Sequence, residues 1–391
     1  MKISNMTLTA YINNLILSKY FRLILLFILC LAVGLQILYN DSIANMIIFK
    51  TSSERLLHHA NLYDYIQYKI IYDKFFYAPQ FALFFLPIAA LPINISIFLW
   101  LFLGAGLFYL ALQNLPLSTT KKTIIFFIAL SDLVNSFQNL QTNAINTAFM
   151  LFIFIFLNNQ KYILAALCVA FCLSIKIYPA AAALLFLFYP NKLKFLLWCG
   201  LFTLLFFLSP LLIIPKEYYF SCLQNWVKAI SEDANDNFIY NSPSLIGINY
   251  TWFSKPMNHF YIQLSGLAIV FIPLYKILKK QTDTTFTLLY LSFIMLFVVI
   301  FNHATESPTY IIATCGAAIW YSLAVKSRLN NLLLVLLIFG CILVPTDLYP
   351  EFIRTKYLTT LKIRVIPCLF IWIKLFCELI VYKPSESIAA I

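Results

Sequence analysis

Charged residues are scarce in this chain. Asp, Glu, Lys and Arg together make up 11% of its 391 residues, whereas hydrophobic residues make up 62%. Water-soluble chains carry roughly 25% charged residues, so this composition excludes a soluble domain of such length. Glycine is also rare, with 8 residues, and no glycine-rich phosphate loop occurs. A cytoplasmic nucleotide-binding domain is therefore excluded, and the energy for a reaction must come from an activated substrate or a gradient.

The nine cysteines have no spacing typical of a zinc site, and they predict no disulfide framework. Acidic residues are outnumbered by basic ones, which gives a net charge of +12. The basic residues stand in short connectors between apolar segments, as the positive-inside rule predicts for cytoplasmic loops. These connectors carry Lys121-Lys122, Lys192/Lys194, Lys276/Lys279/Lys280 and Lys326/Arg328. The charge therefore indicates topology, and we expect no nucleic-acid partner.

The hydrophobic residues group into about a dozen candidate membrane spans, since an apolar run of about 20 residues crosses the hydrocarbon core as a helix. We predict an all-α polytopic membrane protein, with a single integral membrane domain over residues 1–391 and about 12–13 transmembrane helices. The predicted spans are 21–39, 80–93, 96–113, 123–137, 144–158, 161–176, 179–190, 193–214, 260–277, 284–301, 309–325, 331–345 and 363–382.

Three of these segments, 80–93, 123–137 and 179–190, are short for a crossing. If Lys383 is cytoplasmic, counting spans backward places the basic connectors on the cytoplasmic side. Counting forward from a cytoplasmic N-terminus places the chain near residue 140 on the opposite side from the backward count. One short segment must therefore be re-entrant or fail to cross. The first span follows basic residues and is predicted to be a retained helix, not a cleaved signal peptide.

Two long polar segments, 40–79 and 215–258, interrupt the hydrophobic pattern and separate an N-terminal module, 1–214, from C-terminal helices, 215–391. Topology counting places both polar segments, together with 302–308, on the non-cytoplasmic side. They hold most of the acidic residues, and loops longer than about 12–15 residues are uncommon without a function. We expect these loops to face each other over a cavity of head-group size.

Ionisable groups at a membrane are costly, so those at the ends of spans are site candidates. Asp41 follows the first span, where it can act as a general base or merely as a solvated acid at a helix end. His303 and Glu306 lie three residues apart, which would place them on one helical face and let them share a proton.

Amides and a lone lysine form a second group of candidates. Gln141, Asn143 and Asn146 can bind sugar hydroxyls or link helices by hydrogen bonds, and their density favours the first. Lys176 stands between two apolar segments beside Tyr178 and a proline. Its ammonium can pair with a lipid phosphate or extend to the membrane interface.

Other ionisable residues have simpler interpretations. His58 and His59 lie in a polar loop and are expected to be solvated. Lys374 and Glu378 are four residues apart in the last span, so they are expected to pair with each other. Asp132, within 123–137, stays ambiguous.

Taken in order, these polar residues resemble glycosyltransferase family 87, which has the GT-C architecture and includes α-1,2-mannosyltransferases. The resemblance covers residues 35–200 well and the C-terminal half loosely. It rests on the acidic edge after the first span, Asn61-Leu62-Tyr63-Asp64, Tyr77-x-Pro79 with Phe81-Ala82, Leu86-Pro87 and Leu91-Pro92, Gln141-x-Asn143 and Lys176-x-Tyr178-Pro179. In that family the catalytic aspartate stands four residues before an aromatic. Counted back from Phe49, this register falls on Asn45, and Asp41 lies one helical turn earlier.

The resemblance implies a GT-C-like membrane glycosyltransferase of the inner or plasma membrane, with its active side non-cytoplasmic. Such an enzyme would move a mannose-like hexose from a polyprenyl-phosphate donor to a glycan or glycolipid acceptor, without a cofactor or metal. Asp41 would be the base, His303 and Glu306 would lie near the acceptor or leaving group, and Lys176 would bind the donor phosphate. His303 or Glu306 could replace Asp41, or the chain could be inactive. The substrate-binding residues would be Asn45, Tyr77, Gln141, Asn143, Asn146 and Tyr178.

Two other functions fit parts of the sequence. A transporter or flippase of lipid-linked sugars predicts inverted repeats and acids inside spans. The chain has no evident repeat, and its acids gather at one face. A polysaccharide polymerase or ligase predicts an arginine-rich outer loop, but 215–258 has no arginine. The sequence therefore favours the glycosyltransferase.

Overall fold

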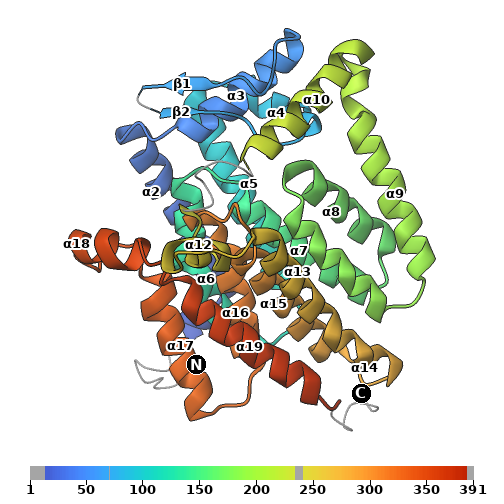
Figure 1. Cartoon of the computed structure of the whole chain (residues 1–391), viewed down its shortest axis with the longest axis vertical. Helices are drawn as coiled ribbons and strands as arrows, with labels where there is room; N and C mark the ends of the chain where they lie inside the picture. Colours follow the sequence, from blue (N-terminus) through green and yellow to red (C-terminus); the bar gives the residue numbers. More distant parts are fainter. Residues whose placement is uncertain (1–13, 70, 234–240, 385–391) are drawn as a thin grey trace, which may run out of the picture.

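A computed structural model describes residues 14–69, 71–233 and 241–384, which are almost entirely helical (Figure 1). Within these ranges, four helical stretches are long and apolar enough to cross a membrane: α2 (Lys19–Tyr39), α5 (Ile93–Asn114), α9 with η2 (Lys192–Leu212), and α13 through α14 (His259–Leu278). Shorter apolar helices are α4 (Pro79–Ala89), α7 (Asn143–Asn158), α8 (Tyr162–Ile175), η1 (Tyr178–Phe188), α15 (Thr284–Ile300) and α17 with η5 (Arg328–Ile342). The bundle also contains α6 (Thr119–Gln138), α16 (Tyr310–Leu323) and α19 (Val365–Val381). The prediction of an all-α polytopic membrane protein is confirmed.

Several helices begin where local chemistry favours a start. Pro79 opens α4, a position at which its missing N–H would be unpaired in any case. The side chain of Ser118 accepts a hydrogen bond from the Lys121 N–H at the start of α6, and Asp283 accepts one from Phe286 at α15. Such caps satisfy N–H groups that have no partner within the helix.

The core of the bundle contains α15, α16 and α7, which are buried along most of their length. α15 and α16 approach closely at Gly316, where an added Cβ would lie 2.9 Å from Met295 Cβ and 3.0 Å from the Ser292 carbonyl oxygen. Small residues allow such approaches between membrane helices. By contrast, α9 and α13 expose apolar side chains such as Leu197 and Phe260, which suit contact with lipid.

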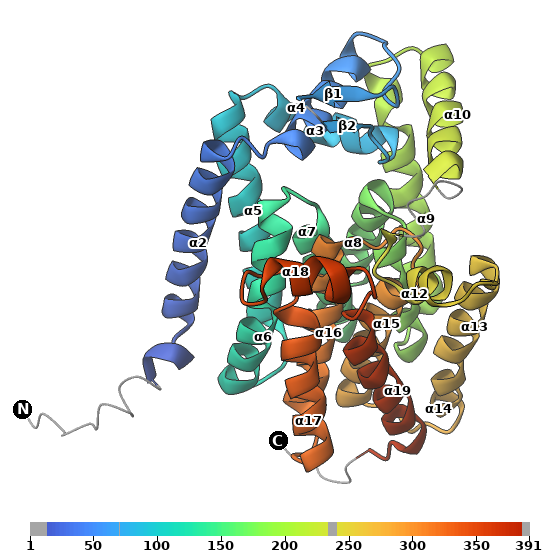
Figure 2. The same ribbon diagram turned by 60° about the vertical axis from the view of Figure 1, so that its left-hand side comes forward.

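The two long polar segments are not open loops. Segment 40–79 contains α3 (Ala44–Leu57) and an antiparallel hairpin of β1 (Ile66–Tyr68) and β2 (Ile71–Asp73). Segment 215–258 contains α10 (Lys216–Asp233) and α12 (Leu245–Trp252). Figure 2 shows α3, the hairpin, α4 and α10 together at one end of the molecule. The expected loops are therefore largely helical, and α3, the hairpin, α4 and α10 form a small folded layer over the bundle, whereas α12 lies beside α13.

α4 is too short to cross a hydrocarbon core as an α-helix. Its 11 residues extend about 16 Å at 1.5 Å per residue, roughly half of a hydrocarbon core of about 30 Å. It packs against α3, in the layer beside the hairpin (Figure 2). Without a crossing at α4, the remaining segments alternate in direction. The basic connectors then all fall at one end of the bundle and the polar segments at the other.

Candidate active site

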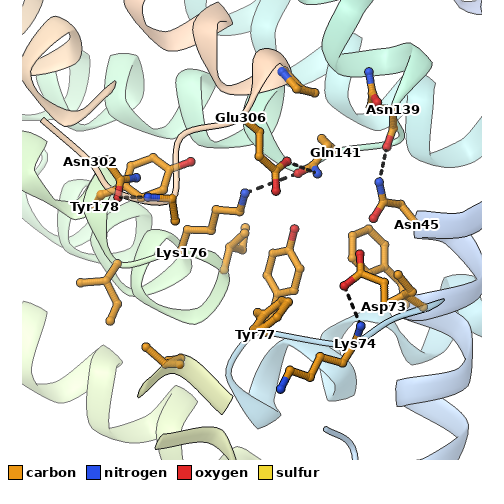
Figure 3. A pocket seen from close by; sticks show the side chains of 18 of the residues that line it. Asn45, Asp73, Lys74, Tyr77, Asn139, Gln141, Lys176, Tyr178, Asn302 and Glu306 are labelled. Carbon is orange, nitrogen blue, oxygen red and sulfur yellow. Dashed lines mark hydrogen bonds between the residues drawn. The ribbon is translucent and has the colours of Figure 1, made fainter. Parts of the chain in front are cut away.

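A cavity of about 660 Å³ lies between the folded layer and the polar end of the bundle. Its walls come from α3, the chain after β2, the end of α8, α10 and two connectors, 139–142 and 301–306. The polar and aromatic residues that line it include Asn45, Asp73, Lys74, Tyr77, Asn139, Gln141, Lys176, Tyr178, Trp226, Asn302, His303 and Glu306 (Figure 3). Sequence segments more than 250 residues apart therefore meet at one site.

A chain of polar contacts crosses one wall of this cavity. The Lys176 ammonium donates to Gln141 Oε1 at 3.4 Å, and Gln141 Nε2 donates to Glu306 Oε2 at 2.8 Å. The ammonium also lies 5.8 Å from the centroid of the Tyr77 ring. Lys176 reaches this place because α8 ends at Ile175 and the backbone of Lys176 is extended, just before the helix that Tyr178 and a proline open. This wall presents a cation that donates to the neutral Gln141 and is connected to Glu306 only through that amide, which suits an anionic ligand.

Asp73 is a cavity residue that the sequence did not single out. It ends β2, is half-buried, and accepts a hydrogen bond from the Lys74 N–H at 2.7 Å. Burial raises the pKa of the Asp73 carboxyl above its ordinary value, although that hydrogen bond works in the opposite direction. The Lys74 ammonium reaches to Glu232 of α10 at 2.9 Å and so ties the hairpin to that helix. A three-residue strand has no periodicity from which this placement could be predicted.

Asp41 does not line the cavity, contrary to our expectation. Its φ of 51° lies in the left-handed region, and its carboxylate turns to the hairpin. There it accepts a hydrogen bond from the Tyr68 hydroxyl at 2.7 Å and pairs with Lys69. The hydrogen bond with Lys69 is the largest cause that lowers the pKa of the Asp41 carboxyl. Asn45 lines the cavity instead, and its side-chain amide donates to the Asn139 carbonyl at 2.8 Å.

His303 and Glu306 both line the cavity, but they do not share one helical face. Residues 301–306 form a turn, because α15 ends at Ile300 and the next helical residues are Ser307–Thr309 of η4. His303 Nδ1 lies 3.3 Å from Gln263 Nε2, whereas Glu306 binds Gln141. Burial, and then the neighbouring His259, lower the pKa of His303. The expected sharing of a proton between them is therefore wrong for this geometry.

Of the remaining predicted residues, Tyr77, Gln141 and Tyr178 line the cavity, but Asn143 and Asn146 do not. Both asparagines are fully buried in α7. Asn143 Oδ1 accepts from the Tyr178 hydroxyl at 3.1 Å, and Asn146 Nδ2 donates to Thr142 Oγ1 at 3.4 Å. Asn143 therefore links α7 to η1 behind the cavity wall, whereas Asn146 forms its hydrogen bond within the first turn of α7.

The ambiguous Asp132 belongs to a fully buried ion pair with Arg364, beneath the turn that carries Glu306. The Arg364 guanidinium also donates to Ser307 Oγ at 2.7 Å and to the Ser307 carbonyl at 3.2 Å. It stacks 4.0 Å from the centroid of the Tyr310 ring. Arg364 thus connects α6 to the residue that follows Glu306.

Among the described residues, no group of three or more His, Cys, Asp or Glu is arranged to hold a metal ion. A model of glycosyltransferase family 87 matches residues 75–345, which is more than half of the chain. The match begins after Asp73 and so does not include Asp41 or Asn45. Neither a curated protein nor a solved structure shows a significant match.

Proposed function

Because the chain belongs to glycosyltransferase family 87 and is a membrane glycosyltransferase, we propose that it uses a polyprenyl-phosphate-linked sugar as donor. The sugar is a hexose, most simply mannose, and it passes to a hydroxyl of a glycan or glycolipid acceptor. The reaction takes place on the non-cytoplasmic side of the inner or plasma membrane, since the basic connectors lie at the opposite end of the bundle.

The observation that carries this proposal is the Lys176 ammonium on the cavity wall. When the sugar leaves a lipid phosphate, negative charge grows on the phosphate oxygens. A cation held in place by Gln141 and beside the Tyr77 ring stabilises that charge without reorganisation. The position of Lys176 at the polar end of the bundle supports its assignment as the partner of the leaving group.

The rest of the cavity wall suits a lipid-linked donor. Apolar side chains of the end of α8, of the connector that follows it and of α10 line the cavity together with the polar residues; they are Leu173, Ile175, Ile177, Trp226 and Ile230. Such a wall accepts the first isoprene units, while Gln141 and Asn139 provide hydrogen-bonding groups for sugar hydroxyls. The donor reaches the cavity by lateral diffusion in the bilayer.

A flippase of lipid-linked sugars is the second candidate, since it would bind the same head group. It would have to pass that head group through the bundle. The helices α15 and α16, which are buried along most of their length, occupy the core of the bundle instead, and the family match favours transfer.

The experiment is transfer of radiolabelled hexose from a polyprenyl-phosphate donor in isolated membranes, with Lys176→Ala compared with wild type. A charge-assisted hydrogen bond contributes about 1.5–3 kcal/mol, so we expect kcat/KM for the donor to fall roughly 10- to 100-fold. Lys161→Ala is the matched control, because Lys161 is exposed at the opposite end of α8. Equal activity of Lys176→Ala and Lys161→Ala would show that Lys176 does not bind the donor phosphate.

A further inference from the structure

We infer that Asp73 is the general base of the transfer reaction, a role that rests on the proposed function. Asp73 stands at the last position of β2, in the hairpin that covers the cavity, and its side chain lines that cavity. The hairpin lies outside the segment that matches the family, so family membership alone does not assign this residue.

The position of Asp73 relative to Lys176 fits the geometry of a displacement. Figure 3 shows the two side chains entering the cavity from different walls, with the Tyr77 hydroxyl pointing into the space between them. A sugar whose phosphate is bound at Lys176 then has its anomeric carbon toward the Asp73 side. An acceptor hydroxyl that approaches opposite the phosphate meets the Asp73 carboxylate.

Glu306 is the other carboxylate on the wall, but its contacts assign it a different task. Its Oε2 accepts from Gln141, and Gln141 Oε1 in turn accepts from Lys176. Glu306 therefore orients the group that holds the phosphate-binding cation, on the leaving-group side. The Asp73 carboxylate accepts a hydrogen bond from the adjacent Lys74 N–H, so its position does not depend on the contacts of Lys176.

The other candidates for the base fit less well. Asp41 does not line the cavity and pairs with Lys69. Asn45 lines the cavity, but an amide does not accept a proton at neutral pH. Half-burial of Asp73 strengthens it as a base, because a desolvated carboxylate binds a proton more readily.

The proposed step conserves atoms and charge. The acceptor oxygen forms a bond to the anomeric carbon as the bond from that carbon to the phosphate oxygen breaks. The bonding electrons leave with the phosphate oxygen, which Lys176 stabilises, and the hydroxyl proton passes to the Asp73 carboxylate. Asp73 then returns the proton to water, and the lipid phosphate diffuses away.

The test measures kcat and donor KM for purified wild type, Asp73→Asn and Asp73→Glu. A positioned base contributes about 10²- to 10⁴-fold. We expect Asp73→Asn to lose at least about 100-fold in kcat while its donor KM stays within about threefold. Asp73→Glu returns a carboxylate and recovers at least about tenfold over Asp73→Asn. Asp64→Asn, the same change at an exposed residue before the hairpin, keeps wild-type kcat.

Donor binding, measured separately by photo-crosslinking of a polyprenyl-phosphate-hexose, confirms that each variant is folded. Asp73→Asn with wild-type kcat would overturn the assignment of the base and leave the proposed function intact. The assignment would also be overturned if Asp73→Glu were as inactive as Asp73→Asn while both variants still bound the donor. Wild type that binds the donor but transfers nothing would overturn the proposed function itself.

Discussion

The two carboxylates of the cavity wall, Asp73 and Glu306, lie in different surroundings. Glu306 is hydrogen-bonded to Gln141, within the network of Lys176. Asp73 is half-buried at a strand end with a backbone N–H as its neighbour. Two acids in one site take different tasks when their surroundings differ. We therefore assign orientation of the phosphate-binding group to Glu306 and proton acceptance to Asp73.

This assignment predicts how activity depends on pH. Burial raises the pKa of the Asp73 carboxyl, and a general base works only when deprotonated. Activity is therefore present above this raised pKa and is lost as pH falls through it. We expect log(kcat/KM) of wild type to show an acidic limb of unit slope, with its midpoint above the ordinary aspartate value of about 3.9.

His303 is the competing source of such a limb, since its own pKa is lowered by burial. The variant His303→Gln separates the two groups. If Asp73 is the base, His303→Gln keeps the acidic limb and Asp73→Glu moves its midpoint. A limb that disappears in His303→Gln would contradict the assignment.

At the scale of residues, the sequence pointed to a lysine that lines the cavity, Lys176, but to an aspartate that does not, Asp41. Lys176 could be identified as a site candidate because a lone charge between two apolar segments is costly in the membrane. The sequence favours Asp41 because it stands at the membrane edge, and it gives no signal for Asp73. The left-handed backbone of Asp41 and its pairing with Lys69 cannot be read from neighbouring residues. Those contacts depend on how the hairpin folds back over the start of α3.

At the scale of elements, the turn 301–306 and η4 determine where His303 and Glu306 lie. Arg364 binds both the carbonyl and the hydroxyl of Ser307, next to Glu306, and pairs with Asp132 in α6. A guanidinium provides several donors in a fixed plane, which a lysine ammonium does not. Arg364 therefore positions the turn that carries Glu306, although it does not line the cavity.

Replacement of this network should separate stability from activity. Asp132→Asn leaves a buried guanidinium without its counter-ion, a change that typically costs about 3–5 kcal/mol, so its Tm should fall most. Arg364→Lys keeps the charge but loses the fork at Ser307, so we expect a smaller fall in Tm and roughly a tenfold loss of kcat.

Lys374 pairs with Glu378 at 3.2 Å, as expected, but this pair lies within α19. The control is therefore Lys216→Gln, because Lys216 lies 3.8 Å from Glu217 where both side chains are exposed. Exposed pairs contribute about 0–1 kcal/mol, so its Tm and kcat should change little. If Arg364→Lys kept wild-type kcat, Arg364 would have no role in positioning Glu306.

The apolar helices could be predicted from the sequence because long hydrophobic runs have one stable place, the bilayer. The folded layer could not. α3 carries Lys, Glu, Arg and several Ser and Thr residues, so its composition resembles that of a loop. Four of its six buried residues, Met46, Phe49, Ser53 and Leu56, repeat every three or four positions, but this face is buried only because α4 packs against α3.

At the scale of the whole molecule, the basic connectors and the acidic residues of the cavity lie at opposite ends of the bundle. The cavity with its acids lies beneath the layer of α3, the hairpin and α10 (Figure 2). Counting spans forward and counting them backward now agree, because α4 belongs to this layer and is not counted as a span. Under the proposed function, this arrangement would let a lipid-linked donor and an acceptor meet at the membrane edge.

The most direct measurement uses purified protein in vesicles that contain a polyprenyl-phosphate-[³H]hexose and an acceptor glycolipid. The label is followed both for chemical transfer and for movement between leaflets. We predict that ³H appears in the acceptor with wild type and falls at least about 100-fold with Asp73→Asn. Movement of intact labelled donor between leaflets, with no label in the acceptor, would contradict the account and identify a flippase.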